Sequence, residues 1–242
     1  MKILLLSKES KSYIVDTSQK KFSCNQGLID LTKTKVGKKI KSNIGAEFLV
    51  LQPTVTDFLR KAGRGPQIIM EKDAAQIAAV TGITNGWKCL DAGSGSGFAA
   101  IMLGNFVKPN GSVVSYEKLE RHHNIAKKNI RYCNLEKIIK IKNKPAEQFK
   151  EKKLDLILLD MPDADKMVKK CYSALKPGGW LCIYSPHIEQ QIKSRKEMEK
   201  AGFMSVRTIE NIQRQWKSLK GFTHPKPSGI VHTGFMTFGR KY

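Results

Sequence analysis

A glycine-rich run is the first feature of this sequence that could do chemistry. Residues 91–97 read Asp-Ala-Gly-Ser-Gly-Ser-Gly and stand between a short apolar stretch and a segment of helical spacing. Glycines there permit positive φ and let the backbone approach a ligand with no Cβ in the way. The free N–H groups of the following helix favour an anionic group. Glu117 comes twenty positions after Gly97, where a carboxylate can accept hydrogen bonds from two ribose hydroxyls. The run therefore predicts a site for a nucleoside-containing cofactor.

A second candidate is Asp160, which ends the apolar stretch 154–160. An uninterrupted apolar run of this length is typical of a strand buried on both faces. Pro162 removes a backbone donor and turns the chain there. Asp160 could instead cap the helix expected from residue 163, but Asp163 and Asp165 are better placed for that role. We therefore expect a carboxylate at the carboxyl edge of the sheet, beside the glycine run.

The elements that must position these groups alternate between strands and helices. Apolar spacing predicts helices over 71–81, 98–106, 119–132, 163–175 and 188–201, and strands over 88–91, 112–117, 138–142, 154–160, 180–185, 206–209 and 230–238. Such alternation is typical of an α/β fold with a mostly parallel sheet. In that fold, ligands bind at the carboxyl ends of the strands.

The first 62 residues follow a different pattern. Short β-rich pieces at 3–6, 13–16 and 48–53 are separated by Gly, Asn, Ser and Lys clusters, which favours a small β module over helices. A turn cluster at 63–66 is a plausible boundary. We predict a β-rich N-terminal domain at 1–64 and an α/β domain at 65–242.

The charge indicates a polyanionic partner. Forty-three Lys and Arg oppose twenty-one Asp and Glu, a formal net charge of +22, which favours nucleic acid or an anionic membrane. No apolar run approaches the roughly 18–20 residues of a spanning helix, so we expect no membrane partner. Five scattered cysteines without a CxxC pair predict reduced thiols in a cytoplasmic protein and no metal site.

The glycine run fits two cofactors. Gly95-x-Gly97-x-x-Ala100 matches the dinucleotide fingerprint of nicotinamide-dependent enzymes. With Asp91 in front, however, the run resembles motif I of class I S-adenosylmethionine-dependent methyltransferases. Residues 175–180, Leu-Lys-Pro-Gly-Gly-Trp, resemble the turn that those enzymes carry before their fifth strand. The pair implies a Rossmann-like methyltransferase fold with S-adenosyl-L-methionine as cofactor.

Further local motifs resemble the tRNA adenine-58 N1-methyltransferase family, from about residue 46 to the C-terminus. They are, in order, Gly65-Pro66-Gln67-Ile68-Ile69 with Lys72-Asp73, motif I, Ser115-Tyr116-Glu117 with His122, Leu159-Asp160-Met161-Pro162, Tyr184-Ser185-Pro186 with Gln190, and His232-Thr233-Gly234-Phe235. The compact archaeal-type members match the length best. The resemblance implies methyl transfer to N1 of adenine 58, and for that type also adenine 57, in the tRNA T-loop, by a homotetramer.

The resemblance also implies roles for individual residues. Asp160 would be catalytic, holding the adenine N6–H while N1 is methylated. The cofactor would be bound by Asp91, Gly93, Ser94, Gly95, Ser96, Gly97, Glu117, His122, Glu147 and Asp160. His122 could equally be a solvated helix-start residue, and Glu147 a surface partner of Lys150. The substrate would be bound by Gln67, Pro162, Arg214, His232 and Thr233.

Other interpretations stay open at this point. Family members often carry D-x-P-x-P-W after the catalytic acid, whereas residues 160–166 read Asp-Met-Pro-Asp-Ala-Asp-Lys, which leaves the target nucleotide open. A class I methyltransferase for another RNA base or for protein isoaspartyl groups is the main alternative. A non-catalytic tRNA-binding subunit is a third, but it predicts an eroded glycine run and a lost acid, and both are intact here.

Overall fold

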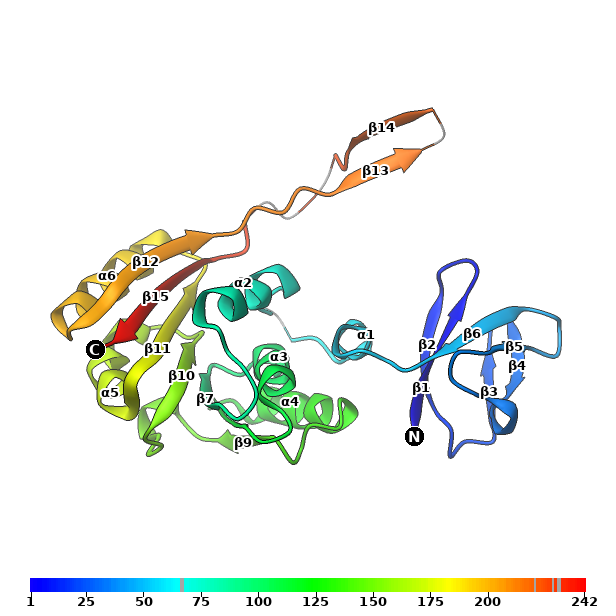
Figure 1. The fold of residues 1–242 in the computed structure, drawn as a ribbon, viewed down its shortest axis with the longest axis horizontal. Coiled ribbons are helices and arrows are strands. Elements are labelled where there is room, and N and C mark those ends of the chain that lie inside the picture. Colours follow the sequence, from blue (N-terminus) through cyan, green and yellow to red (C-terminus); the bar gives the residue numbers. More distant parts are fainter. Residues whose placement is uncertain (66–67, 220, 228, 230–231) are drawn as a thin grey trace. The chain divides into compact units, whose positions relative to one another are not determined.

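The computed structural model describes residues 1–65, 68–219, 221–227, 229 and 232–242. The chain divides into two compact units, Met1–Ala62 and Gly63–Tyr242. We describe each unit by itself (Figure 1). The boundary between these units lies two residues before the predicted division between residues 64 and 65, which stays a prediction.

The first unit is a β module with a closed apolar core. A four-stranded antiparallel sheet has the order β2-β1-β6-β5, and β3 and β4 form a separate hairpin. Their bounds are β1 Lys2–Ser7, β2 Ser12–Asp16, β3 Lys21–Cys24, β4 Gly27–Asp30, β5 Lys39–Lys41 and β6 Glu47–Leu51, with a 3-10 helix at Leu31–Lys33. Alternating side chains of these strands, among them Ile3, Leu5, Val15 and Phe48, form the core.

This unit also holds a helix that the sequence interpretation missed. Helix α1 spans Val55–Lys61. Thr54 and Asp57 form a reciprocal capping box, in which each side chain binds the other residue's backbone N–H. The spacing T-x-x-D is a helix-start signal, but seven residues were too few to show helical apolar spacing.

The second unit is built on a seven-stranded sheet of order β12-β15-β11-β10-β7-β8-β9. All neighbouring strands are parallel except that β15 runs antiparallel to both β11 and β12. The strands are β7 Lys88–Ala92, β8 Ser112–Glu117, β9 Ile139–Asn143, β10 Leu154–Leu159, β11 Leu175–Ser185, β12 Phe203–Glu210 and β15 Phe235–Lys241. The mostly parallel α/β sheet predicted from the sequence is confirmed.

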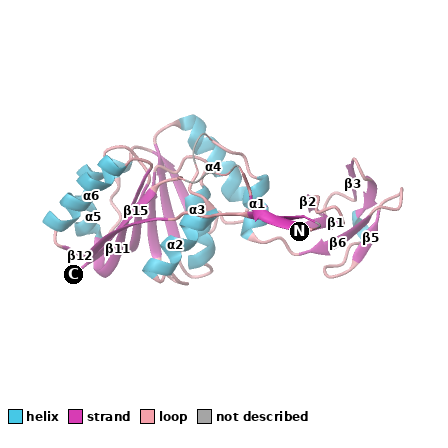
Figure 2. Cartoon of the chain, turned by 90° about the horizontal axis from the view of Figure 1, so that it is seen from above, coloured by secondary structure: helices cyan, strands magenta, loops and turns pink. Residues whose placement is uncertain are grey.

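Helices cover both faces of this sheet. They are α2 Glu71–Thr81, α3 Phe98–Val107, α4 Glu120–Tyr132, α5 Val168–Ala174 and α6 Ile188–Lys200. Figure 2 shows α5 and α6 on one side of the strands and α2, α3 and α4 on the other. Since both faces are buried, β10 is buried along its whole length.

Three expectations about elements need correction. The helix expected over 163–175 is a 3-10 turn at Ala164–Met167 followed by α5, because Asp163 takes a left-handed φ of 59°. The strand expected over 230–238 begins at Phe235, and residues 230–231 lie outside the described residues. A hairpin of β13 Trp216–Leu219 and β14 Phe222–Pro225 was not expected. All four residues of β13 are exposed, so the strand needs no alternation of apolar and polar residues that could have predicted it.

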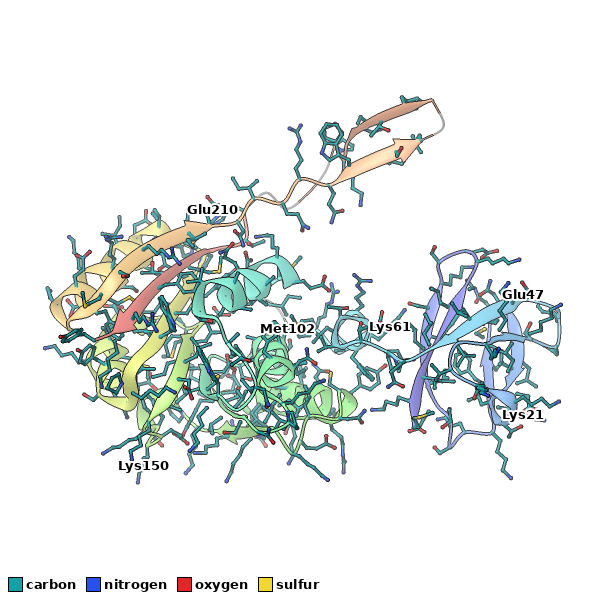
Figure 3. All side chains as sticks on the ribbon, in the orientation of Figure 1. Lys21, Glu47, Lys61, Met102, Lys150 and Glu210 are labelled. Atoms are coloured by element: carbon teal, nitrogen blue, oxygen red, sulfur yellow. The ribbon has the colours of Figure 1, made fainter. Side chains whose placement is uncertain are left out.

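The basic side chains lie on the surface of both units. Exposed lysines occur in the first unit, such as Lys21 and Lys61, and in the second, such as Lys150 (Figure 3). Among the described residues, no helix is both long and apolar enough to span a bilayer.

Candidate active site

The glycine loop joins β7 to α3 at the carboxyl edge of the sheet. Gly93, Gly95 and Gly97 have φ of +84°, +53° and +81°, the left-handed region that the sequence interpretation expected. A Cβ on Gly93 would overlap the Asp160 carbonyl oxygen, and one on Gly97 would lie 3.1 Å from Ala126 Cβ. Glycine is therefore required by both conformation and space.

A buried carboxylate supports the loop from behind. Ser115 Oγ donates to Asp91 Oδ2 at 2.6 Å and lies 2.7 Å from Ser94 Oγ. The other oxygen, Asp91 Oδ1, is buried and has no partner among the described residues. Burial, and then the charge of Glu117, raise the pKa of Asp91 to about 6, while the Ser115 bond opposes the rise. Asp91 thus shapes the loop through Ser115.

Glu117 is held in a fixed orientation at the end of β8. Its Oε2 accepts the Gly95 N–H at 2.9 Å, and its Oε1 accepts the Leu119 N–H at 2.9 Å. A carboxylate offers about four acceptor positions, so two remain after these bonds. Glu117 can therefore accept two vicinal hydroxyls without losing its hold on the loop.

A cavity of about 290 Å³ lies over these groups. Among its lining residues are Gly93, Gly95, Glu117, His122, Glu147, Asp160 and Pro162. The sequence resemblance predicts that the first six bind the cofactor and that Pro162 binds the substrate. Asp91, Ser94, Ser96 and Gly97, assigned to the cofactor as well, do not line this cavity. They lie in or behind the loop, where they determine its shape.

Asp160 meets the loop because β10 and β7 are parallel neighbours. Leu159 pairs with Ala92, and the Asp160 N–H donates to the Ala92 carbonyl at 2.8 Å. Its half-buried carboxylate lines the cavity. Desolvation, and then the charge of Asp91, raise the pKa of Asp160 to about 7. The site therefore holds an acid whose proton is exchangeable near neutral pH.

The cavity suits a nucleoside cofactor with a small charged group. It offers free acceptor positions on Glu117 for ribose, close backbone approach at two glycines, and an acidic side chain at Asp160. Its size is near the lower limit for small-molecule sites. His122 comes from the first turn of α4 and Glu147 from the 3-10 helix Ala146–Gln148. Both lie at the cavity wall, and Glu147 makes no ion pair with Lys150 among the described contacts.

A buried asparagine that is not among the residues predicted from the sequence connects the loop to the start of the unit. Asn129 of α4 is 4% exposed. Its Oδ1 accepts the Gly63 N–H at 3.0 Å, and its Nδ2 donates to the carbonyls of Gly63 at 2.7 Å and Ser96 at 2.8 Å. The Gly65 N–H also donates to Ser96 Oγ. A polar residue among the apolar positions Ala126 and Ile130 was the signal that could have revealed it.

The remaining substrate candidates lie elsewhere. Arg214 and Thr233 line a second cavity of about 570 Å³, together with Lys72. Lys72 Nζ donates to Asp73 Oδ1 and Thr233 Oγ1, both at 2.7 Å, and Thr233 Oγ1 donates to Asp73 Oδ2 at 2.8 Å. The structure therefore brings Arg214 and Thr233 to one cavity and Pro162 to another.

Two further candidates have different outcomes. His232 is occupied: its Nδ1 lies 2.5 Å from Glu210 Oε1 and its Nε2 lies 2.8 Å from the Pro186 carbonyl. These acceptors raise the pKa of His232, the Glu210 bond most. Gln67 lies outside the described residues.

Tyr184, near the end of β11, contacts Asp73, the partner of Lys72 and Thr233. Its hydroxyl donates to Asp73 Oδ2 at 3.5 Å. Burial raises the pKa of Tyr184 to about 12, and the negative charges of Asp73 and Asp160 contribute to the rise. Tyr184 therefore lies within the electrostatic range of both carboxylates.

Comparison with known proteins decides the family. Residues 48–226 match the model of the family described as tRNA methyltransferase complex GCD14 subunit. The chain belongs to this family. The resemblance identified from the local motifs is thereby confirmed.

Two relatives that match this chain over nearly its full length agree with this assignment. A Methanocaldococcus jannaschii protein named tRNA (adenine(57)-N(1)/adenine(58)-N(1))-methyltransferase TrmI is 28% identical, over 98% of this chain and 94% of its own length. A Thermus thermophilus tRNA (adenine(58)-N(1))-methyltransferase TrmI is 27% identical, over 99% and 96%.

Solved structures confirm the class I methyltransferase fold. An S-adenosylmethionine-dependent O-methyltransferase from Thermotoga maritima superposes with a TM-score of 0.84 at 29% identity, covering 99% of this chain and 92% of its own. The tRNA (m1A58) methyltransferase TrmI of Aquifex aeolicus gives 0.79 at 24% identity, covering 100% and 97%. Both cover the β-rich unit as well as the α/β unit.

Proposed function

We propose that this chain methylates N1 of adenine 58 in the T-loop of tRNA, with adenine 57 as a second target. The observation that carries the proposal is the Asp160 carboxylate, which lines the same cavity as the glycine loop. The family membership and the names of the full-length relatives support the tRNA substrate. When bound, S-adenosylmethionine supplies a methyl group activated by its sulfonium charge.

The residues present divide the work between binding and charge stabilisation. Glu117 accepts the ribose hydroxyls, and the Gly93–Gly95 backbone lets the cofactor lie close to the sheet. His122 and Glu147 complete the wall of the cofactor cavity. Methyl transfer requires the adenine nitrogen, the methyl carbon and the sulfur to be held in line. These residues supply that alignment on the cofactor side.

Asp160 acts on the base. Its carboxylate accepts a hydrogen bond from the exocyclic N6–H, which raises the electron density at N1. Methylation of N1 places a positive charge on the ring, and a preorganised carboxylate stabilises that charge as it develops. Because a T-loop adenine is stacked, it must leave the stack to reach Asp160. Pro162 lies at the cavity beside Asp160 and can form part of the wall for the extruded base.

The test uses unmodified tRNA transcript and methyl-labelled cofactor. We expect label in 1-methyladenosine after digestion, and a loss of rate of about 100-fold or more in Asp160→Asn. Asp165→Asn, an acid-to-amide change five residues along, is the matched control and should keep its rate. Transcripts with guanosine at position 57 or 58 separate the two target positions.

Three results would contradict the proposal. Label in a protein substrate but in no RNA would indicate an isoaspartyl enzyme. Label in a different nucleoside would indicate another RNA base. tRNA binding without any transfer would indicate a non-catalytic subunit. The homotetramer and the cytoplasmic location stay predictions, and sedimentation of the full chain tests the assembly.

A further inference from the structure

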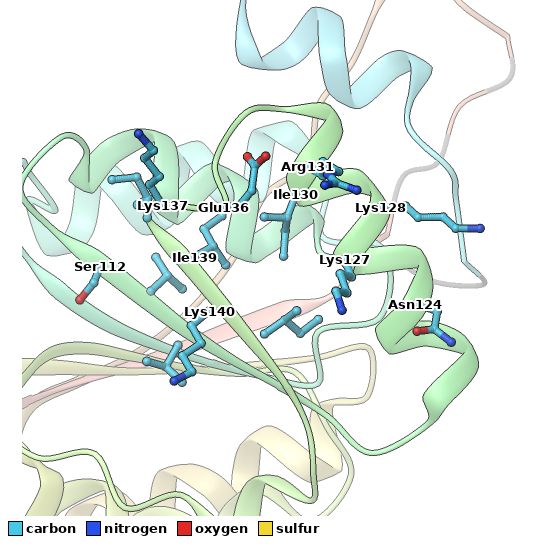
Figure 4. Close-up of a pocket in the computed structure, with 14 residues that line it drawn as sticks. Ser112, Asn124, Lys127, Lys128, Ile130, Arg131, Glu136, Lys137, Ile139 and Lys140 are labelled. Atoms are coloured by element: carbon cyan, nitrogen blue, oxygen red, sulfur yellow. The ribbon is translucent and has the colours of Figure 1, made fainter.

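A large groove lies between α4 and the edge strand β9 (Figure 4). Its volume is about 1020 Å³. Strand β9 ends the sheet order, and among the described strands it pairs only with β8, so one of its edges is open. The groove is lined by apolar side chains that belong to the core, including Val113, Ile130 and Ile139.

The rim of the groove is strongly basic. Five exposed cations surround it: Lys127, Lys128, Arg131, Lys137 and Lys140. Among the described residues that line it, Glu136 is the one acidic side chain. Within the described part of the chain, no acidic group lies in ion-pair contact with any of the five. Their charge is therefore available to a ligand.

The basic rim is connected to the active site by one helix. His122, in the first turn of α4, lines the cofactor cavity, and Lys127, Lys128 and Arg131 follow on the groove side of α4. Residues three and four apart lie on one face of a helix, with about 5.4 Å between turns. The cations therefore form a row that leads away from the site where the adenine must sit.

This row favours an extended polyanion over a small anion or an added strand. A single phosphate would be satisfied by one or two of the cations, whereas the row extends over more than one turn of α4. An added peptide strand would have to pair with β9, whose lysines at 140 and 142 are typical of edges protected against pairing. A nucleic-acid strand has charges at regular intervals and apolar sugar faces that suit an apolar floor.

We propose that the α4–β9 groove binds the ribose-phosphate backbone of the tRNA outside the extruded nucleotide. The inference rests on the proposed function for its ligand. The groove binds by charge and shape, because folded RNA is contacted mainly through phosphates and 2′-hydroxyls. It holds the tRNA while Asp160 receives the base.

The test compares two matched double variants of the full chain. Lys127→Gln with Lys128→Gln removes two charges from the rim. Lys193→Gln with Lys196→Gln removes two exposed charges from α6, on the other side of the sheet. We expect the rim variant to weaken binding of unmodified tRNA about 10-fold and to reduce the slope of log K against log salt by about 1–2. The α6 variant should change either quantity little.

Affinity for the cofactor and the rate at saturating tRNA should stay unchanged in both variants, since neither pair lines the cofactor cavity. If the rim variant does not fold, Lys137→Gln with Lys140→Gln tests the same rim from the opposite side, in β9 and the turn before it. The inference is overturned if tRNA binding weakens equally in the rim and α6 variants, or in neither. The proposed function still stands in that case, provided that the wild-type protein methylates tRNA. Rim-dependent binding of an acidic peptide rather than tRNA also overturns the inference. Wild-type binding of tRNA without methylation would contradict only the proposed function.

Discussion

At the scale of the residue, the site depends on two carboxylates at the ends of neighbouring strands. Asp91 lies in β7 opposite Leu158, and Asp160 follows Leu159 at the end of β10. Burial raises the pKa of Asp91 to about 6 and, together with the charge of Asp91, the pKa of Asp160 to about 7. Burying an acid favours its neutral form. The arrangement therefore costs stability whenever the buried carboxylates are charged.

The stability lost by burying Asp160 should depend on pH, and thermal melts can measure the direction of this dependence. Because the pKa of Asp160 is about 7 when folded and near 4 when unfolded, its contribution to stability is fully present below about pH 4 and is lost as pH rises through about 7. Asn cannot ionise, so Asp160→Asn should melt roughly 5 °C higher than wild type at pH 8. The difference should shrink towards pH 4.5 in thermal melts.

The control is Asp163→Asn, which changes a carboxylate that is 67% exposed. It should show no such pH-dependent gain. A constant difference between wild type and Asp160→Asn at both pH values would show that Asp160 is not buried in its charged form.

The glycine loop supports a second prediction at this scale. Gly93→Ala should destabilise the protein by more than about 3 kcal/mol, because its Cβ would overlap the Asp160 carbonyl in addition to the strained φ. Gly82→Ala is the matched control, since Gly82 has φ +70° but nothing within 4 Å of the added Cβ. It should cost only about 1–2 kcal/mol. Urea unfolding measures both, and equal losses would show that space at Gly93 is not limiting.

At the scale of the element, α4 serves three surfaces at once. Its first turn reaches the cofactor cavity, its exposed lysines line the groove, and its buried face carries Asn129. Asn129 joins Gly63 to the glycine loop through the Ser96 carbonyl. Helix α4 therefore holds Gly63 and the glycine loop together through one buried side chain.

Asn129→Ala should weaken binding of the cofactor more than binding of tRNA. It leaves the Gly63 N–H and the Gly63 and Ser96 carbonyls without their partner, and a lost buried hydrogen bond costs about 1–3 kcal/mol. We expect the Kd for S-adenosylmethionine to rise about 10-fold, measured by calorimetry, with the KM for tRNA unchanged. Asn124→Ala, at an exposed position of the same helix, should leave the Kd as in wild type. A lower melting temperature with an unchanged Kd would assign Asn129 a purely structural role.

At the scale of the whole molecule, each of the two units carries more basic than acidic residues. Each has its own apolar core. The first 62 residues carry twelve Lys and Arg against five Asp and Glu. Among the described residues, in contrast, those that line the cofactor cavity all belong to the second unit. The two units thus differ in what they can contribute.

Residues 63–242 alone should therefore bind S-adenosylmethionine within about 2-fold of the full chain. Their affinity for tRNA should fall at least about 10-fold, with a shallower salt dependence, because the truncation removes twelve Lys and Arg side chains that can pair with phosphates. Calorimetry and filter binding over a salt series check the two parts. Unchanged tRNA affinity would show that the first unit makes no contact with RNA.

The sequence by itself determined the class of fold, the glycine loop and the position of Asp160. Each of these depends on local patterns: alternating strand and helix spacing, glycines where φ is positive, and an acid that ends a buried strand. Such patterns are visible because the residues concerned are neighbours along the chain. Parallel pairing then brings the loop and the acid to one edge.

Only the tertiary structure decided which candidates meet. Asn129 and Gly63 are 66 positions apart, and nothing local pairs them. Thr233 and Arg214 belong to the second cavity, and His232 is held by Glu210 and Pro186. The groove beside β9 exists because β9 ends the sheet order. Sequence periodicity reports which side of an element is buried, whereas packing between distant segments decides what that side touches.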